Sequence, residues 1–306
     1  MNIEPEVDRP NVGREGPGSD EVTGWKLTWI RFRRERVAMW ATGIVMFALT
    51  VSILAPLLAP YALGEGSSDF TAPPSSDHWL GTNNIGYDTF SQLLYGMRTS
   101  FAAASIAVSM AVIIGSTLGL ISGYTGGWPD RLIMRLTDAV MAFPGLLLAM
   151  AVVGVLGPGI VNAMIGLSFV FAPNFVRLVR GQVLALREES YVEAAQVIGC
   201  GRLHIARVHI VPNVLAPLVV QGFMTMGFAL VAEGALAFLG LSVQPPEISL
   251  GSMIRGGFAA MNATFRLALV PGLAITILSV SFNAIADGLR DAMGRRTTGE
   301  HLTRAG

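Results

Sequence analysis

The stretch YVEAAQVIGCGRLHIARVHIVPN, from Tyr191 to Asn213, is polar, charged and rich in small residues, yet it lies between two of the most apolar parts of the chain. Charged side chains are costly inside a lipid bilayer, so a membrane protein keeps a segment of this kind outside the hydrocarbon. The stretch therefore predicts an exposed connection between two membrane spans.

The whole chain is short of charged residues. Of its 306 residues 52% are hydrophobic and only 14% are charged, whereas ordinary soluble domains carry about 25% charged residues. The apolar runs are roughly 20 residues or longer, which is enough to cross about 30 Å of hydrocarbon. We predict an all-α membrane protein with a transmembrane domain from 37 to 290 and six spans, at about 37–61, 100–124, 133–156, 161–180, 214–241 and 267–289.

The basic residues are distributed unevenly between the connections. If the amino terminus is cytoplasmic, 18 of the 21 lysines and arginines fall on the cytoplasmic side. The three on the other side are Arg98, Arg255 and Arg266. Cytoplasmic loops carry the excess of Lys and Arg, so both termini and the Tyr191–Asn213 stretch are predicted to be cytoplasmic. The long loops 62–99 and 242–266 are then external, and neither looks like an independent domain.

The two ends of the chain are predicted to be cytoplasmic tails, 1–36 and 291–306. No secretory signal is expected, because a signal begins its apolar core early and the first apolar run here starts only at about residue 37. Residues 1–22 are rich in Glu, Asp, Gly and Pro without an apolar period, so that part of the tail is predicted to be disordered. The single cysteine, Cys200, excludes an internal disulfide.

The connecting segment of about 188–212 contains helix start and stop signals. Ser190 and Glu193 have the spacing of a capping box, and Gly199 supplies the positive φ that ends a helix. A second short helix is predicted over 202–211, and Pro212 suits the first turn of the fifth span, where its missing N–H costs nothing. We therefore predict two short helices at a sharp angle on the cytoplasmic side.

The first of these helices has a weakly apolar face, formed by Val192, Ala195 and Tyr191. Ala194 and Ala195 would let another surface approach closely. Two interpretations remain open: a capped connector that rests on its own bundle, or a docking helix for another protein. Glu193 has the same ambiguity, because it could contact a partner or only cap the helix.

The segment resembles a known family loop. Its EAA, followed after three residues by Gly and later by HIVPN, is similar to the cytoplasmic EAA loop of ATP-binding-cassette importer permeases. In that family the loop inserts into a groove of the cytoplasmic ATPase subunit. Cys200 stands where a small residue such as Ala is common. The resemblance implies an ATPase-coupling set consisting of Tyr191, Glu193, Ala194, Ala195, Gly199, His209, Pro212 and Asn213.

The resemblance extends over nearly the whole chain. HWLGTNNIGYDTFSQLLYGMRTS (78–100), GYTGGWPDRLIMRLTDAVMAFPGLLLA (123–149), FLGLSVQPP (238–246) and DGLRDAM (287–293) are similar to blocks of the dipeptide, oligopeptide and nickel permeases, specifically their C-type subunit. Asn83 replaces a usual Asp, Tyr87 a usual Arg and Leu250 a common Trp. These departures lie in the external loops, so they bear on substrate or partner details and not on the fold.

This family implies a set of partners in the bacterial cytoplasmic membrane. They are a second, homologous permease that completes a heterodimer, two cytoplasmic ATP-binding subunits and an extracytoplasmic substrate-binding protein. Lipid surrounds the spans, and no nucleic acid is expected. The implied solutes are di- or oligopeptides, with nickel chelates or glutathione-like solutes as the alternative.

The chain is not expected to be an enzyme. A phosphate-binding loop needs the lysine of G-x-x-x-x-G-K-[ST], and the only lysine, Lys26, follows Trp25. ATP and Mg²⁺ would therefore be bound by the partner ATPase subunits. No metal site is expected, because there is no H-E-x-x-H motif, and His204 and His209 are too far apart around a helix to share a ligand. A channel or secondary carrier without an ATPase, or a membrane scaffold, remains the competing class.

Two acidic residues in the spans are candidates for a pathway or an outer gate. Asp138, one turn inside the third span, is expected to form an ion pair with Arg131 or Arg135. Glu233 lies 20 residues beyond Asn213, or about 30 Å along a helix, and therefore near the external surface. It could line the mouth of a path or hold helices together through a hydrogen bond.

Small residues and prolines mark the packing of the spans. The glycines of 115–123 and 234–240 would permit close helix approach. Pro144, Pro173 and Pro271 fall inside apolar runs, where proline bends helices.

Overall fold

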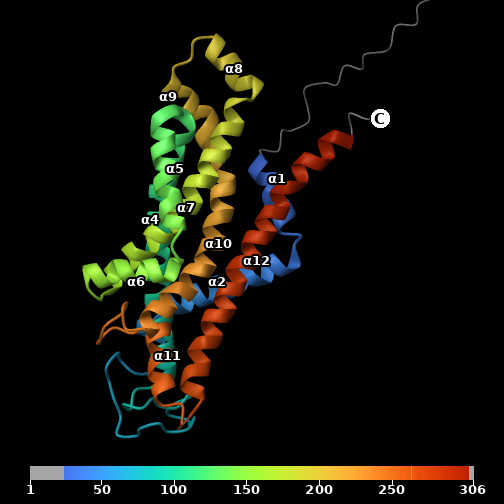
Figure 1. The fold of residues 1–306 in the computed structure, drawn as a ribbon. Coiled ribbons are helices and arrows are strands. Elements are labelled where there is room, and N and C mark those ends of the chain that lie inside the picture. Colours follow the sequence, from blue (N-terminus) through green and yellow to red (C-terminus); the bar gives the residue numbers. More distant parts are fainter. Residues whose placement is uncertain (1–23, 263, 303–306) are drawn as a thin grey trace, which may run out of the picture.

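The computed structural model describes residues 24–262 and 264–302, and every element named within them is a helix (Figure 1). Only two isolated β-bridges occur in these ranges, Gly66–Tyr87 and Thr82–Asp88. The helices are α1 (Gly24–Phe32), α2 (Arg36–Ile53), α3 (Ala55–Leu58), α4 (Thr89–Thr125), α5 (Gly127–Met141), α6 (Gly145–Leu156), α7 (Ile160–Arg187), α8 (Ser190–Val197), α9 (Arg202–Ile205), the π-helical turn η1 (Ala206–Ile210), α10 (Val211–Phe238), α11 (Leu250–Ala259) and α12 (Arg266–Leu302).

Five straight helical segments are long and apolar enough to cross a membrane: α2, α4, α7, η1 with α10, and α12. The bent pair α5 and α6 supplies a sixth crossing if it counts as one span. The predicted number of spans thus agrees with the fold, but one of the six is broken.

The break falls in the third predicted span. α5 and α6 meet at 95°, and Pro144 stands immediately before α6. Proline lacks an N–H and disfavours helical φ/ψ in the residue before it, so the helix stops near Phe143 and restarts in a new direction. The N–H of Gly159 donates to the carbonyl of Leu241, 3.1 Å away, which places the α6–α7 turn beside the end of α10. The bend predicted at Pro144 is confirmed, and the segment predicted as the third span, about 133–156, is a bent pair of helices that counts as one span only if α5 and α6 are taken together.

The start of the second span and the end of the first also differ from the predicted positions. α4 begins at Thr89 and not at about residue 100, because the Asp88 carboxylate accepts the N–H of Ser91 at 2.7 Å and so caps the helix. With 37 residues, α4 is about 55 Å long and projects beyond the hydrocarbon. The first span is shorter than predicted: α2 ends at Ile53, and α3 follows as a separate short helix.

The centre of the bundle is the interface of α4 with α7, and α10 packs against both. Gly115, Gly119 and Gly123 line this interface, where an added Cβ would meet the backbone of α7. The predicted role of these glycines in close helix approach is confirmed. Pro173 and Pro271 both lie inside continuous helices, α7 and α12.

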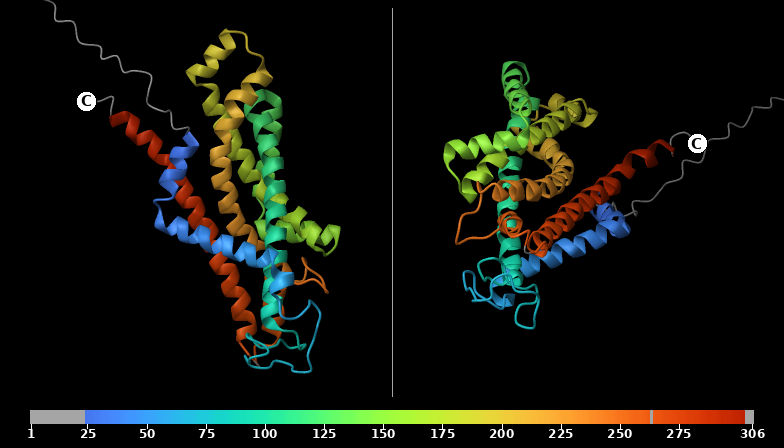
Figure 2. Two further views of the ribbon diagram at one scale, coloured as in Figure 1. Left: turned by 180° about the vertical axis from the view of Figure 1, so that it is seen from behind. Right: turned by 60° about the horizontal axis from the view of Figure 1, so that its bottom comes forward.

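The two ends of the bundle differ. α8 lies at one end, and the carboxyl end of α12 points the same way (Figures 1 and 2). The long loop between α3 and α4 and the helix α11 lie at the opposite end. The segment predicted to be disordered, residues 1–22, is outside the described residues. The rest of the predicted amino-terminal tail contains the helix α1, and the predicted carboxyl tail continues α12 as far as Leu302.

Candidate functional site

The helix α8 packs on its own bundle through one side. Val192 and Ala195 are buried, and they join a cluster with Val179 and Val183 of α7 and with Ile205, Ile210 and Val214 of the returning chain. Val192 and Ala195 of the apolar face recognised in the sequence are therefore directed inward, whereas Tyr191 is 41% exposed. The two buried side chains fix the position of α8 relative to α7 and α10.

A different side of α8 is free. Glu193 and Ala194 are exposed, and at the end of the helix Val197 is 82% and Ile198 81% exposed. Isolated apolar side chains are common on surfaces, but an adjacent pair at a helix tip, beside Ala194, offers a partner a compact apolar contact. The side available for docking is the Glu193–Ala194–Val197–Ile198 side.

The turn that ends α8 has the predicted geometry. Gly199 has φ of +89°, and the N–H of Cys200 donates to the carbonyl of Ala195 at 3.0 Å. This is the long bond of a Schellman motif, which requires a positive φ at the glycine. No atom outside the local chain lies within 4 Å of a Cβ built on Gly199, so the backbone conformation alone favours glycine here.

The start of α8 differs from the prediction. The helix includes Ser190, and the carbonyl of Glu189 accepts the Glu193 N–H at 3.2 Å. The cap position is therefore Glu189, one residue earlier than the expected capping box of Ser190 and Glu193. Glu193 is left on the exposed side of α8.

The second short helix is not separate from the fifth span. α9 passes into the π-turn η1, which continues directly into α10. Pro212 lies in the first turn of α10 as predicted. The independent helix expected over 202–211 is thus the first part of one continuous helical rod, which consists of α9, η1 and α10. A π-helical turn of this kind is frequent at functional sites.

Three residues of the coupling set meet at the base of this rod. The rings of Tyr191 and His209 lie 5.7 Å apart between centroids, and the Asn213 amide donates to the His209 carbonyl at 2.6 Å. Burial, together with the neighbouring carboxylate of Glu189, raises the pKa of Tyr191. Tyr191 is therefore a neutral hydroxyl that joins the start of α8 to the rod.

The corner beneath α8 is braced by ionic contacts that the sequence did not reveal. The Arg180 guanidinium donates to both oxygens of Asp130, from Nε at 2.6 Å and from Nη2 at 2.8 Å, and the Ser122 hydroxyl donates to the same carboxylate. Arg187 donates to the carbonyl of Gly123 at 3.0 Å. A bidentate pair of this kind fixes orientation as well as distance, so the α4–α5 corner and α7 are held together directly below α8.

Asp138 is in an ion pair, but with a different partner from the one predicted. Its Oδ1 lies 2.7 Å from Nη2 of Arg177 on α7, and the expected pairs with Arg131 and Arg135 do not form. Both side chains are about half exposed, so the pair contributes little to stability. It ties α5 to α7 on the same side as the Asp130–Arg180 pair.

Glu233 lies near the opposite end of the bundle and is only 1% exposed. The Ser100 hydroxyl donates to its Oε2 at 3.0 Å, and the Ser242 hydroxyl to its Oε1 at 3.2 Å. Ser100 in turn accepts the N–H of Leu250 at 3.1 Å. The carboxyl group therefore joins α4, α10 and the start of α11, which is the arrangement expected of a packing contact.

Replacing Glu233 by alanine is expected to lower the free energy of unfolding by about 1–3 kcal/mol, because the Ser100 and Ser242 hydroxyls lose their buried acceptor. Glu233→Gln keeps the shape and can still accept one of these bonds, so it should lose less than half as much. Thermal unfolding of the purified variants measures the difference. A Gln variant that folds normally but transports nothing would contradict the packing role and favour a charged carboxylate in the pathway.

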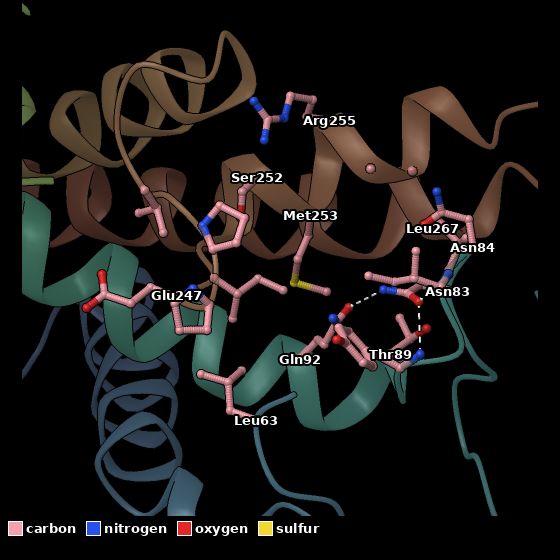
Figure 3. Close-up of a pocket in the computed structure, with 18 of the residues that line it drawn as sticks. Leu63, Asn83, Asn84, Thr89, Gln92, Glu247, Ser252, Met253, Arg255 and Leu267 are labelled. Carbon is pink, nitrogen blue, oxygen red and sulfur yellow. Dashed lines mark hydrogen bonds between the residues drawn. The ribbon is translucent and has the colours of Figure 1, made fainter. Parts of the chain in front are cut away.

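A cavity of about 460 Å³ opens beside this region, between the α3–α4 loop, the α10–α11 loop and α11. Asn83 and Gln92 lie at one side of it, with Arg255 and Glu247 on other parts of the rim (Figure 3). The Asn83 amide donates to Gln92 at 3.0 Å, and its oxygen accepts the N–H groups of Ile85 and Tyr87, both at 2.9 Å. Asn83, one of the departures from the family pattern, thus shapes the wall of this cavity.

The other two departures have local structural roles. The Tyr87 ring lies against Gly66, where an added Cβ would be 2.9 Å from Cε1. Leu250 is fully buried at the start of α11. The α3–α4 loop also contains a buried pair that the sequence did not indicate, in which Nδ1 of His78 lies 3.0 Å from Oδ1 of Asp88. The Asp88 cap could have been found from its spacing to Ser91, whereas the contact with His78 had no local signal.

No group of three or more His, Cys, Asp or Glu side chains able to hold a metal occurs within residues 24–262 and 264–302. The bundle, with a small apolar-tipped helix fixed beyond one end and long loops at the other, has the fold of a multi-span membrane protein.

Comparison with known proteins identifies the family. Residues 115–299 match the binding-protein-dependent transport system inner membrane component family. Residues 23–74 match the N-terminal transmembrane domain of oligopeptide transport permease C. The chain therefore belongs to the inner membrane components of binding-protein-dependent transport systems, and it is a multi-pass protein of the inner membrane.

Several relatives match over most of their length. The glutathione transport system permease protein GsiD of Pectobacterium atrosepticum is 39% identical over 89% of this chain and 91% of its own. The dipeptide transport system permease protein DppC of Alkalihalophilus pseudofirmus is 39% identical over 90% and 92%. A GsiD of Escherichia coli is 41% identical over 92% and 93%.

The fold is also similar to solved structures. Two inward-facing crystal forms of the MetNI methionine ABC transporter match with TM-scores of 0.53 and 0.55, at 19% and 17% identity. Each match covers 66% of this chain, and 96% and 97% of the matched chains. At such identities the likeness concerns the fold alone, and it supports the assignment of the bundle as a permease fold.

Proposed function

We propose that this chain is one of two membrane subunits of an ATP-driven importer that receives di- or oligopeptides from an extracytoplasmic binding protein. The observation that carries the proposal is the position of α8, which is fixed to α7 and α10 through Val192 and Ala195 while its tip is free. A helix held in this way can pass a movement of a docked protein directly to two membrane-crossing helices.

The mechanism follows from that connection. ATP binding draws two ATPase subunits together, and the movement reaches α7 and α10 through α8 and the α9–η1 segment. The pathway between this chain and a second, homologous permease then changes from inward-facing to outward-facing. Glu193 and Ala194 contact the ATPase beside the tip, Gly199 sets the angle of α8, and Tyr191, His209, Pro212 and Asn213 join α8 to α10.

ATP and Mg²⁺ are bound by the partner subunits in this proposal. The support is chemical: the only lysine is Lys26, and a phosphate-binding loop cannot be built around it. The side that carries α8 is cytoplasmic, because 18 of the 21 basic residues belong to that side. The binding protein then docks over the external loops and the cavity that Asn83 and Arg255 border.

The choice of solute comes from the relatives. DppC of A. pseudofirmus is a dipeptide permease by name and the GsiD proteins are glutathione permeases. The amino-terminal match to oligopeptide permease C makes peptides the first choice. Glutathione, itself a tripeptide-like solute, is the second, and nickel chelates the third.

Uptake by cells that lack only this subunit tests the proposal. ATP-dependent uptake of a labelled dipeptide is expected to disappear and to return with the wild-type chain, with labelled glutathione and a nickel chelate assayed in parallel. Restoration of glutathione uptake alone would change the solute but keep the mechanism. Uptake that survives ATP depletion and follows an ion gradient would show a secondary carrier and contradict the proposal.

A further inference from the structure

The cavity between the α3–α4 loop, the α10–α11 loop and α11 has walls that are fixed by their own contacts (Figure 3). At the start of α11 the Ser249 hydroxyl accepts the N–H of Ser252 at 3.3 Å, and the Ser252 hydroxyl accepts the N–H of Ser249 at 2.9 Å. A Cβ on Gly251 would collide with the Gly234 backbone, so α11 lies directly against α10. Since the bonds of Asn83 fix another wall, the cavity is a formed feature and not a gap between loose loops.

The size and the lining of the cavity suit a small organic molecule. Its volume of about 460 Å³ falls in the range of roughly 300–1,000 Å³ that small-molecule sites occupy. Val243, Met253 and Leu267 border it and are themselves buried, so they present a fixed apolar surface. Such sites combine an apolar lining with a few polar groups that orient the ligand. The apolar part of a ligand would lie against these three side chains.

Polar groups gather on a different side of the cavity. Thr89, Asn83 and Gln92 all border it and come together in Figure 3. Thr89 is only 1% exposed, and its hydroxyl has no hydrogen-bond partner among the residues that the structure describes. A buried hydroxyl without a partner is uncommon, and the neighbouring amide groups both donate and accept hydrogen bonds. This side of the cavity therefore suits a ligand with peptide groups, which also donate and accept.

The rim of the cavity carries charges of both signs. Arg255 on α11 and Glu247 on the α10–α11 loop border the cavity and are exposed. A Cβ on Gly240 would collide with Nη1 of Arg255, so the guanidinium group lies against the turn that follows α10. A guanidinium group matches the geometry of a carboxylate, and Glu247 on the same rim favours a ligand that also carries a positive charge. The rim thus suits a zwitterion better than a simple anion.

We infer that this cavity is a binding site for a short zwitterionic peptide, with the peptide carboxylate at Arg255. The side chain of the peptide packs on the apolar side of the cavity, and its peptide group bonds on the side of Thr89 and Gln92. The inference rests on the proposed function, in which this end of the bundle is external and the cargo is a peptide. The permease subunit itself then holds the solute after the binding protein releases it and before it enters the pathway.

Binding of the dipeptide alanylleucine to the full-length chain in nanodiscs tests the site, with ligand-observed NMR as the readout and no ATPase present. Arg255→Gln should weaken binding about tenfold, the effect of losing one hydrogen bond to a charged group. Arg255→Lys keeps the charge and should lose less. Arg98→Gln is the matched control, because Arg98 is an exposed arginine of α4 outside the cavity lining, and it should bind the dipeptide as the wild type does.

Modified ligands test the orientation of the peptide. Alanylleucine amide, which lacks the carboxylate, should bind the wild type about tenfold more weakly, and Arg255→Gln should weaken its binding no further, since the contact is already lost. N-acetylalanylleucine, which lacks the positive charge, should bind about threefold more weakly, as expected for an exposed ion pair. Equal binding of alanylleucine and both modified ligands would overturn the assignment to a zwitterion held at Arg255.

A second variant tests the cavity itself. Gly256 borders it from α11, and no atom outside the local chain lies within 4 Å of an added Cβ. Gly256→Leu should therefore fold normally, fill part of the cavity and abolish measurable dipeptide binding, whereas Gly256→Ala should bind as the wild type does. Thermal unfolding in the same nanodiscs checks that the leucine variant is folded.

The outcomes separate this site from the proposed function. No dipeptide binding by the wild type, or binding that Arg255→Gln and Gly256→Leu leave unchanged, would overturn the site even if peptide uptake is intact. Equal losses in Arg255→Gln and Arg98→Gln would show a general effect of charge and would also overturn it. A folded Gly256→Leu variant that keeps dipeptide binding but loses docking of the binding protein would make the cavity a docking site instead. Dipeptide binding that needs Arg255, in a chain that supports no peptide uptake, would confirm the site and contradict the proposed function.

Discussion

Placing aspartate at both Val197 and Ile198 is expected to detach the ATPase from the membrane subunit and to reduce ATP-driven uptake to background. The two side chains form the exposed tip of α8, at 82% and 81% exposure. If the tip enters a groove of the ATPase, the variant must bury two carboxylates without partners, which is strongly unfavourable. Because apolar anchors at the centre of an interface dominate binding, affinity should fall at least roughly 100-fold.

Co-purification of the ATPase with the membrane subunit measures this loss, and uptake is followed in the same cells. The control is Val197→Leu with Ile198→Leu, which keeps the tip apolar and should retain binding. The aspartate variant should still insert and fold, because neither side chain belongs to the buried cluster of Val192 and Ala195. Full ATPase binding by the aspartate variant would show that the docking surface lies elsewhere.

The sequence predicted the existence of α8 but not its orientation. Gly199 marked the stop, and the apolar side chains marked a helix. An eight-residue helix with Ala194 and Ala195 on adjacent faces carries too little pattern to show which face is buried. Only the position of Val179 and Val183 on α7 decides that, and they are contributed by a separate helix. The two interpretations of this helix, a connector that rests on its own bundle and a docking helix for another protein, therefore do not exclude each other. One side of α8 can pack on the bundle while another side binds a partner.

The ionic contacts illustrate a second limit. The prediction paired Asp138 with arginines close in sequence, whereas its partner Arg177 is on α7. Likewise, nothing local indicates that Asp130 and Arg180 form a bidentate pair. Such pairs depend on the rotation of α5 relative to α7, which follows from the packing of both helices against the bundle. Local composition supplies the charges, and tertiary packing selects the partners.

The third span shows what proline can and cannot indicate. Pro144 predicted an interruption, because a proline removes a helical hydrogen bond and restricts the residue before it. The 95° angle was not predictable from that rule alone. It depends on where α6 finds neighbours: Ala149 and Val153 are buried against Ala163 and Leu167 of α7.

The second large effect, a loss of folded protein, is expected from substitutions at the glycines of α4. A Cβ on Gly115 would lie 2.5 Å from Cβ of Phe175 and 2.6 Å from the carbonyl of Ala172. A Cβ on Gly119 would lie 2.7 Å from the carbonyl of Val176. The obstacles are backbone atoms and the first side-chain carbon, which cannot move aside by rotation. Adding methyl groups must therefore push α4 and α7 apart along the largest interface of the bundle.

The double variant Gly115→Ala with Gly119→Ala is accordingly expected to lose most of its folded, monodisperse protein, as measured by size-exclusion chromatography and thermal unfolding in detergent. Overpacking typically costs about 1–3 kcal/mol per site, which exceeds the roughly 1 kcal/mol that alanine gains over glycine in a helix. Gly222→Ala on α10 is the matched control, because no atom beyond its own helix lies within 4 Å of its added Cβ. It should be neutral or slightly stabilising. If all three substitutions behaved alike, the effect would reflect helix propensity, and the close approach of α4 and α7 would not be what these glycines provide.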